Sequence, residues 1–148
     1  MDNFSSIKEK ILHLRKSGKI SCELANRPSE ASQKALEIFA QQLGFSVKNS
    51  LDEIEKNLAL KIAKSVLSHD LAYQVKIIGE DQALEIIKAF CGLFNKDAKF
   101  FTNAIFEEDD QYHLKMKSWN GVTEATFDTG IFVIDEKLIG CIWVEDED

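Results

Sequence analysis

Residues 99–148 read KFFTNAIFEEDDQYHLKMKSWNGVTEATFDTGIFVIDEKLIGCIWVEDED, and this stretch decides the fold that we predict. It consists of runs rich in Phe, Ile, Val, Thr and Trp, which favour β-strands, separated by short polar turns. The Asn120-Gly121 pair indicates a tight turn, because both residues tolerate a positive φ angle. We therefore predict an antiparallel meander of four strands, over residues 99–107, 112–119, 125–134 and 137–144.

The chain before this stretch follows the helical period of about 3.6 residues instead. Ile7 and Ile11 fall on one face of a helix, and Ser50 with Glu53 has the spacing of a capping box that begins another. Pro28 suits the first turn of a helix, where its missing N–H has no partner to lose. These patterns predict helices over residues 5–17, 28–43, 50–68 and 80–94.

The two parts together predict an α+β fold, in which about four N-terminal helices pack on a C-terminal four-stranded antiparallel meander. A chain of 148 residues has the size of one typical domain. We expect a single domain over residues 1–148, with a helical part over residues 5–95 and an antiparallel sheet over residues 99–145.

The cysteines and the N-terminus indicate the compartment. Cys22, Cys91 and Cys141 are odd in number and have apolar or helix-forming neighbours, which favours free thiols over a disulfide framework. The N-terminal sequence MDNFSSIKEK lacks the pattern of a signal peptide. No apolar run approaches the roughly 20 residues that span a bilayer. We expect a cytoplasmic protein that does not enter a membrane.

The negative charge of the chain is concentrated in the predicted sheet. The formal net charge is −7, and residues 99–148 hold 4 Lys and 12 Asp or Glu, whereas residues 1–98 hold 14 Lys or Arg and 13 Asp or Glu. Contacts with phosphate require Lys and Arg, so the acidic part argues against direct binding of nucleic acid. It favours either a basic protein partner or a role in solubility alone.

The sequence contains no motif for catalysis, phosphate binding, a metal or a cofactor. None of its three histidines lies at metal-ligand spacing from a cysteine or another histidine. We therefore expect no catalytic residue, no metal and no cofactor. Two other functions stay open: an adaptor or oligomerisation domain that uses an exposed sheet edge, and a small enzyme or ligand-binding domain with a site near His113, Asp128 and Cys141.

Acidic side chains gather in the predicted turns and at the end of the sequence, at residues 107–110 and 145–148. Neither block has the D-x-[DN]-x-[DN]-G pattern with which a loop bends around calcium. They are either solvated surface or a docking surface for a basic protein, in which Trp119 beside the Asn120-Gly121 turn acts as an aromatic anchor. The candidate partner-binding residues are Glu107, Glu108, Asp109, Asp110, Trp119, Asp128, Asp135, Glu136, Glu145, Asp146 and Glu147.

A small acidic α+β domain with a helical first part, a strand-rich last part, no catalytic set and the end GCIWVEDED resembles bacterial immunity proteins. These proteins neutralise a cognate toxin in contact-dependent inhibition and related polymorphic-toxin systems. The resemblance is one of class, covers the whole chain and includes no diagnostic motif. It implies a toxin partner that is often a basic nuclease, whose substrate-binding cleft the acidic residues cover. An acidic inhibitor is steered toward such a surface and needs no chemistry of its own.

Overall fold

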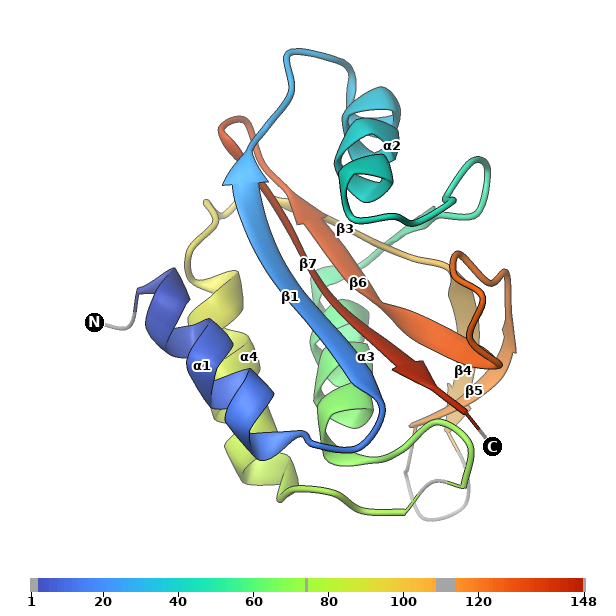
Figure 1. Ribbon diagram of the computed structural model, residues 1–148. Coiled ribbons are helices and arrows are strands. Elements are labelled where there is room, and N and C mark those ends of the chain that lie inside the picture. Colours follow the sequence, from blue (N-terminus) through green and yellow to red (C-terminus); the bar gives the residue numbers. More distant parts are fainter. Residues whose placement is uncertain (1–2, 74, 109–113, 148) are drawn as a thin grey trace.

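The computed structural model describes residues 3–73, 75–108 and 114–147, and within them the chain is an α+β fold of four helices and seven strands (Figure 1). The helices are α1 (Phe4–Leu14), α2 (Ser32–Gln42), α3 (Lys56–Ser68) and α4 (Glu80–Cys91). The strands are β1 (Lys19–Asn26), β2 (Asp52–Ile54), β3 (Lys99–Thr102), β4 (Ala104–Glu108), β5 (Leu114–Trp119), β6 (Phe127–Ile134) and β7 (Leu138–Asp146).

Five of the strands form one antiparallel sheet in the order β1-β7-β6-β3-β2, and β4 pairs with β5 in a separate two-stranded sheet. The centre of the large sheet is the hairpin of β6 and β7, whose register runs from Phe127 opposite Asp146 to Ile134 opposite Ile139. β1 lies on the outer side of β7, from Lys19 opposite Glu145 onward. The N-terminal part of the chain therefore supplies an edge strand of the large sheet.

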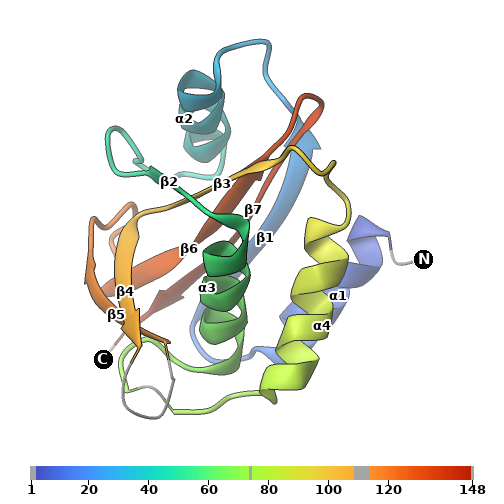
Figure 2. The ribbon, with the colours of Figure 1, turned by 180° about the vertical axis from the view of Figure 1, so that it is seen from behind.

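Helices cover both faces of the large sheet, with α2 on one face and α1, α3 and α4 on the other (Figures 1 and 2). Alternate residues of β6 enter different clusters: Ile131 packs on the side of α3 and α4, and Phe132 packs on the side of α2. A strand that is buried on both faces has few positions left for polar side chains. This explains why β6 and β7 contain the most continuous apolar runs of the chain.

The predicted four-stranded meander is wrong, because two strands of the large sheet come from the part that we predicted to be helical. β1 has the period of two residues of a strand: Ile20, Cys22 and Leu24 face α1, α3 and α4, and the residues between them face the other way. The Ser50/Glu53 pattern does not begin a helix. It leads into β2, and α3 begins later, at Lys56 after the N-cap residue Glu55.

The predicted strand at residues 99–107 is also two strands, because the chain turns out of the large sheet at Asn103. The Asn103 side chain is buried, and its Nδ2 donates to the carbonyl oxygens of Asn120 and Asp128 (3.0 Å each). Its Oδ1 accepts a hydrogen bond from Thr129 Oγ1 (2.7 Å). β3 therefore stays paired with β6, while β4 leaves to pair with β5. The predicted start of the next strand, Tyr112, lies outside the described residues.

The helix boundaries also differ from the prediction. α1 begins after Asn3, whose side chain accepts a hydrogen bond from Ser6 N (2.9 Å), and it ends at Leu14. Pro28 lies in the loop before α2, which begins at Ser32. In the described part of the chain, no helix combines the length and the apolar character needed to cross a membrane.

Candidate functional site

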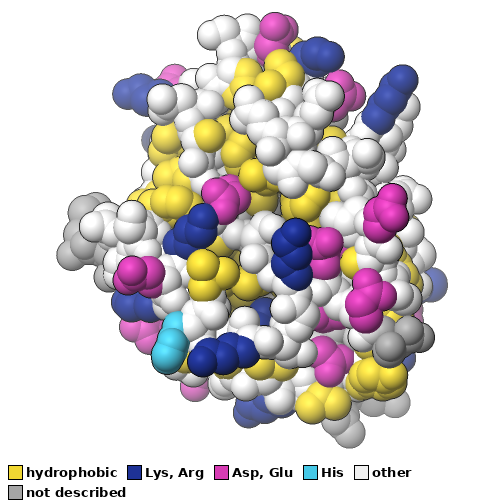
Figure 3. All heavy atoms as spheres, in the orientation of Figure 1, with side chains coloured by type: hydrophobic (Ala, Val, Ile, Leu, Met, Phe, Trp, Pro, Cys, Tyr) yellow, Lys and Arg dark blue, Asp and Glu magenta, His cyan; other side chains and the backbone are white. Residues whose placement is uncertain are grey.

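The candidate site is a hollow of about 680 Å³ where β7 ends, which we call the acidic hollow. Four segments meet there: the turn between α1 and β1, the loop after α3, the loop before β6 and the end of β7. Figure 3 shows several Asp and Glu side chains on this side of the molecule, at its lower right. The lining residues are Ser17, Gly18, Lys19, Asp70, Tyr73, Glu124, Ala125, Glu145, Asp146 and Glu147.

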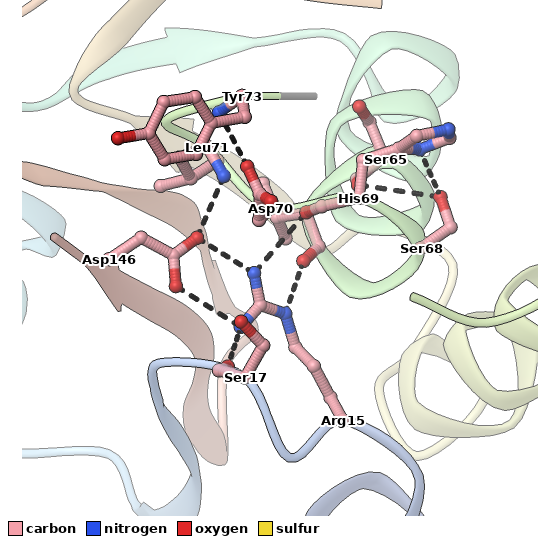
Figure 4. Close-up of polar contacts among 10 residues, drawn as sticks. Arg15, Ser17, Ser65, Ser68, His69, Asp70, Leu71, Tyr73 and Asp146 are labelled. Carbon is pink, nitrogen blue, oxygen red and sulfur yellow. Dashed lines mark hydrogen bonds and ion pairs between the residues drawn. The ribbon is translucent and has the colours of Figure 1, made fainter. Parts of the chain in front are cut away.

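A buried ion pair joins three of these segments: the turn after α1, the loop after α3 and the end of β7 (Figure 4). Arg15 Nη2 donates to Asp146 Oδ2 (2.9 Å) and to the carbonyl oxygen of His69 (3.2 Å), and Arg15 Nε donates to the carbonyl oxygen of Val66 (2.7 Å). Asp146 Oδ2 also accepts a hydrogen bond from Leu71 N (2.8 Å). One guanidinium and one carboxylate therefore join α1, the end of α3, the loop that follows it and β7.

Gly18 is required in this arrangement for two reasons. Its φ angle is +69°, in the left-handed region that favours glycine, and a Cβ atom here would collide with the Asp146 carboxylate. The tight turn from α1 into β1 and the buried ion pair therefore depend on the same residue.

The acidic hollow carries more negative charge than its own cations balance. Asp146 is paired with Arg15, and Glu145 lies 3.8 Å from the exposed Lys19 Nζ. Within the described residues, no Lys or Arg forms an ion pair with Asp70, Glu124 or Glu147, the other three acids of the lining. A cation that enters the acidic hollow therefore meets three carboxylates that no Lys or Arg of the described residues neutralises.

Hydrogen bonds fix the direction of two of these acids, and an aromatic ring stands beside one of them. Asp70 Oδ1 accepts from Tyr73 N (2.6 Å), and Glu147 Oε1 accepts from Thr126 N (3.2 Å). The Tyr73 side chain is 68% exposed and lines the hollow. Carboxylates beside an exposed aromatic ring form a surface suited to an arginine or lysine side chain.

The predicted residues of the β4–β5 hairpin lie close to this end of the molecule. Both ribbon views place the end of β4 near the end of β7. Glu108 Oε1 lies 3.2 Å from Lys61 Nζ, and Glu107 Oε2 lies 3.9 Å from Lys117 Nζ, so each has a lysine beside it. Asp109 and Asp110, from the same predicted block, lie outside the described residues.

Four other predicted residues do not join the acidic hollow. Asp128 is buried and accepts hydrogen bonds from the backbone N–H groups of Val122 and Thr123. Trp119 is partly buried, and its ring packs at a tilt of 30° against that of Phe127, with 5.2 Å between centroids. The other two, Asp135 and Glu136, lie at the opposite end of β6, in its turn to β7.

Asp135 stabilises that turn through its carboxylate. Burial acts to raise the pKa of Asp135, but hydrogen bonds from the backbone N–H groups of Asn95, Leu138 and Lys137 outweigh burial and hold the pKa below its usual value. A carboxyl group whose pKa is lowered by folding contributes stability above its unfolded-state pKa of about 3.9. That contribution is lost as the pH falls through the folded-state pKa.

We predict that Asp135→Asn lowers the free energy of unfolding at pH 7, and that its difference from the wild type shrinks as the pH falls below about 4. Urea unfolding at pH 7 and pH 3 measures both differences. Glu136→Gln, which removes an exposed carboxylate from the same turn, is the control. An equal loss of stability for Asp135→Asn at both pH values contradicts the assigned role.

The structure does not bring Asp128 and Cys141 together. Cys141 lies opposite Phe132, four residues along β6 from Asp128, which is about 13 Å at the rise of a strand. Cys141 is fully buried, and burial raises the pKa of its thiol well above the usual value. The third residue of that predicted site, His113, lies outside the described residues. In the described ranges, no group of three or more His, Cys, Asp or Glu side chains is arranged to hold a metal ion.

The sequence analysis missed two acids and the aromatic residue of the acidic hollow: Asp70, Glu124 and Tyr73. Asp70 and Tyr73 belong to a connection between helices, and Glu124 is an isolated acid between predicted strands. Only the position of Tyr73, an aromatic residue in a connection between two predicted helices, offered a signal in the sequence. Comparisons with known proteins add no further residues, because no family model, curated protein or solved structure matches the chain.

Proposed function

We propose that this chain is a cytoplasmic immunity-type inhibitor that binds a basic toxin protein through the acidic hollow. The observation that carries the proposal is the lining of the hollow, in which Asp70, Glu124 and Glu147 face a cavity of about 680 Å³ beside an exposed tyrosine. A nuclease surface that binds phosphate presents Arg and Lys side chains. Such side chains fit between these carboxylates and the ring of Tyr73.

The recognition surface extends beyond one hollow. A second hollow, of about 410 Å³, shares Lys19, Glu124 and Glu145 with the first and continues along residues 43–46 and 121–123. Two adjoining hollows with acids on their common wall suit a protein loop that carries more than one cation. The same charges raise the rate at which a basic partner associates, and this rate falls with ionic strength.

The three cysteines support the proposed compartment. All three are buried free thiols, and burial raises the pKa of Cys22 to about 12 and that of Cys91 to about 11. Thiols in this state suit a reducing environment and are poor nucleophiles. They favour a binding protein over an enzyme that uses a cysteine nucleophile.

The test is co-expression of the chain with the protein encoded by each adjacent gene, followed by purification and measurement of the dissociation constant. We expect a stable complex with one neighbour, and the double variant Glu124→Lys/Glu147→Lys should bind it at least about tenfold more weakly. The matched control is Glu30→Lys/Glu136→Lys, which makes the same change in net charge with two exposed acids far from the hollow.

Two results count against the proposal. The first is the absence of a stable complex with any encoded neighbour. The second is a complex whose affinity falls equally in the hollow variant and in the control variant, because binding then follows net charge and does not involve this surface.

A further inference from the structure

Lys19 is the cation that two adjoining hollows have in common. It lines the acidic hollow and also the second hollow of about 410 Å³, and within the described residues no other Lys or Arg lines either of them. The two linings share two further residues, Glu124 and Glu145. Lys19 therefore stands on the common wall, where a partner that enters both hollows would meet it.

The backbone fixes the place of Lys19 on this wall. Lys19 is the first residue of β1 and lies opposite Glu145 of β7 in the register of the large sheet (Figure 1). Gly18, directly before it, has a φ angle of +69° and leaves no room for a Cβ atom beside the Asp146 carboxylate. A tight turn and a strand pair thus hold the main chain of Lys19, while its side chain is 74% exposed.

The contact between Lys19 and Glu145 is easily broken from the lysine side. Nζ of Lys19 lies 3.8 Å from Oε2 of Glu145, whose side chain is only 17% exposed. Water and salt screen a pair that has an exposed partner, so its separation costs little free energy. Because the Glu145 side chain is mostly covered, its carboxylate stays on the wall when Lys19 moves into solvent.

We propose that Lys19 is an internal competitor for the basic partner: its ammonium group neutralises Glu145 in the free chain, and an arginine of the partner displaces it. The inference rests on the proposed function, since it assigns a role to one residue of the same site. A planar guanidinium forms two parallel hydrogen bonds with a carboxylate, whereas an ammonium group is a point charge on a flexible stem. Lys19 therefore selects against weakly basic proteins, which do not repay its displacement.

A purely structural role of Lys19 predicts a different result. If the pair with Glu145 only joins β1 to β7, removing it lowers the stability of the fold and does not tighten binding. β1 already pairs with β7 along all eight of its residues, and an exposed ion pair adds little to such a contact. A lower urea midpoint for Lys19→Gln together with an unchanged affinity would assign the pair to the strand contact alone and overturn the proposal.

The first experiment measures the affinity of a fluorescent hexa-arginine peptide by anisotropy at low ionic strength, where screening is weakest. We expect Lys19→Gln to bind the peptide at least about threefold more tightly than the wild type, because the hollows then lack their own cation. The control is Lys96→Gln, the same change in net charge at an exposed lysine. Lys96 follows Asn95, whose N–H bonds to Asp135 at the other end of β6, so its substitution should change the affinity by less than about 1.5-fold.

The second experiment determines whether Lys19 acts through Glu145. In the background of Glu145→Gln, the gain from Lys19→Gln should shrink to less than about 1.5-fold, because the carboxylate for which the two cations compete is absent. An equal gain in both backgrounds identifies a general effect of charge and overturns the proposal.

The hollow variant Glu124→Lys/Glu147→Lys separates a failure of this inference from a failure of the proposed function. If it binds the peptide more weakly than its charge-matched control while Lys19→Gln binds as Lys96→Gln does, the acidic hollow takes cations and only the role of Lys19 is overturned. If the wild type does not bind the peptide, or if affinity follows net charge alone in every variant, the acidic hollow is not a cation site and both proposals fail.

Discussion

Asp146→Ala should lower the free energy of unfolding by about 3–5 kcal/mol, because it leaves a buried guanidinium without its counter-charge. The Arg15 side chain is fully buried, and the Asp146 side chain is 4% exposed. The substitution also removes the acceptor for Leu71 N, so the loop that carries Asp70 and Tyr73 loses its attachment to β7. Chemical unfolding of both proteins, followed by circular dichroism, measures the difference.

The matched control is Lys34→Ala, which removes one partner of the exposed pair Lys34–Glu37 (3.7 Å). An exposed pair of this kind contributes at most about 0.5 kcal/mol, because water and salt screen it. If Asp146→Ala shifts the unfolding midpoint no more than Lys34→Ala does, the ion pair with Arg15 does not hold the turn after α1, the loop after α3 and the end of β7 together.

Trp143→Ala should cost about 3–5 kcal/mol of unfolding free energy, the range for removal of a large aromatic side chain from a core. Trp143 is fully buried on the side of the sheet that α2 covers. Its ring lies 5.1 Å from that of Phe132 and 6.0 Å from that of Phe45, measured between centroids. The cavity left behind would lie between β7 and the chain after α2, whose Phe45, Val47 and Leu51 belong to the same buried cluster.

The other tryptophan provides the control. Trp119 is partly buried and packs on Phe127, so Trp119→Ala should cost about 1–2 kcal/mol. Trp143→Phe gives a second check. Trp143 Nε1 has no hydrogen-bond partner among the described residues, so the substitution Trp143→Phe loses no hydrogen bond. Trp143→Phe should therefore cost less unfolding free energy than Trp143→Ala. Equal losses for Trp143→Ala and Trp119→Ala contradict the assignment of Trp143 to the core.

Periodicity located the four helices but not their ends. The apolar positions Ile7, Ile11, Ile87 and Phe90 are buried as the helical period predicts. The ends depend on single hydrogen bonds and on the tertiary structure around them. Ser50 and Glu53 have the spacing of a capping box, yet Glu53 lies in β2 opposite Phe101, because pairing with β3 at this position outweighs the local pattern.

The sheet could not be derived from the order of the strands. The alternation of Ile20, Cys22 and Leu24 contains a signal for β1 that the prediction of a helical part over residues 5–95 overlooked. Its pairing with β7 joins residues more than a hundred positions apart, which no local pattern specifies. The break between β3 and β4 depends on Asn103, whose hydrogen bonds to residues 120, 128 and 129 exist only in the folded chain.

Sequence reasoning grouped acids that the fold separates. Asp128 and Asp135 resemble Glu145 and Glu147 in the sequence, since all four follow or begin apolar strands. The first two accept hydrogen bonds from the backbone of neighbouring turns and are buried. Only burial and hydrogen bonding distinguish an acid that shapes a turn from one that meets a partner. The role of Arg15 as the buried partner of Asp146 is likewise visible only from burial and hydrogen bonding in the folded chain.

The most direct test of the central claim is a titration of the adjacent-gene protein with this chain while the toxic activity of that protein is measured. The proposal predicts that the activity falls to background near one copy of the chain per toxin. It also predicts that Glu124→Lys/Glu147→Lys requires at least about tenfold more protein, whereas Glu30→Lys/Glu136→Lys behaves as the wild type. Full toxic activity in the presence of excess wild-type chain would contradict the proposed function.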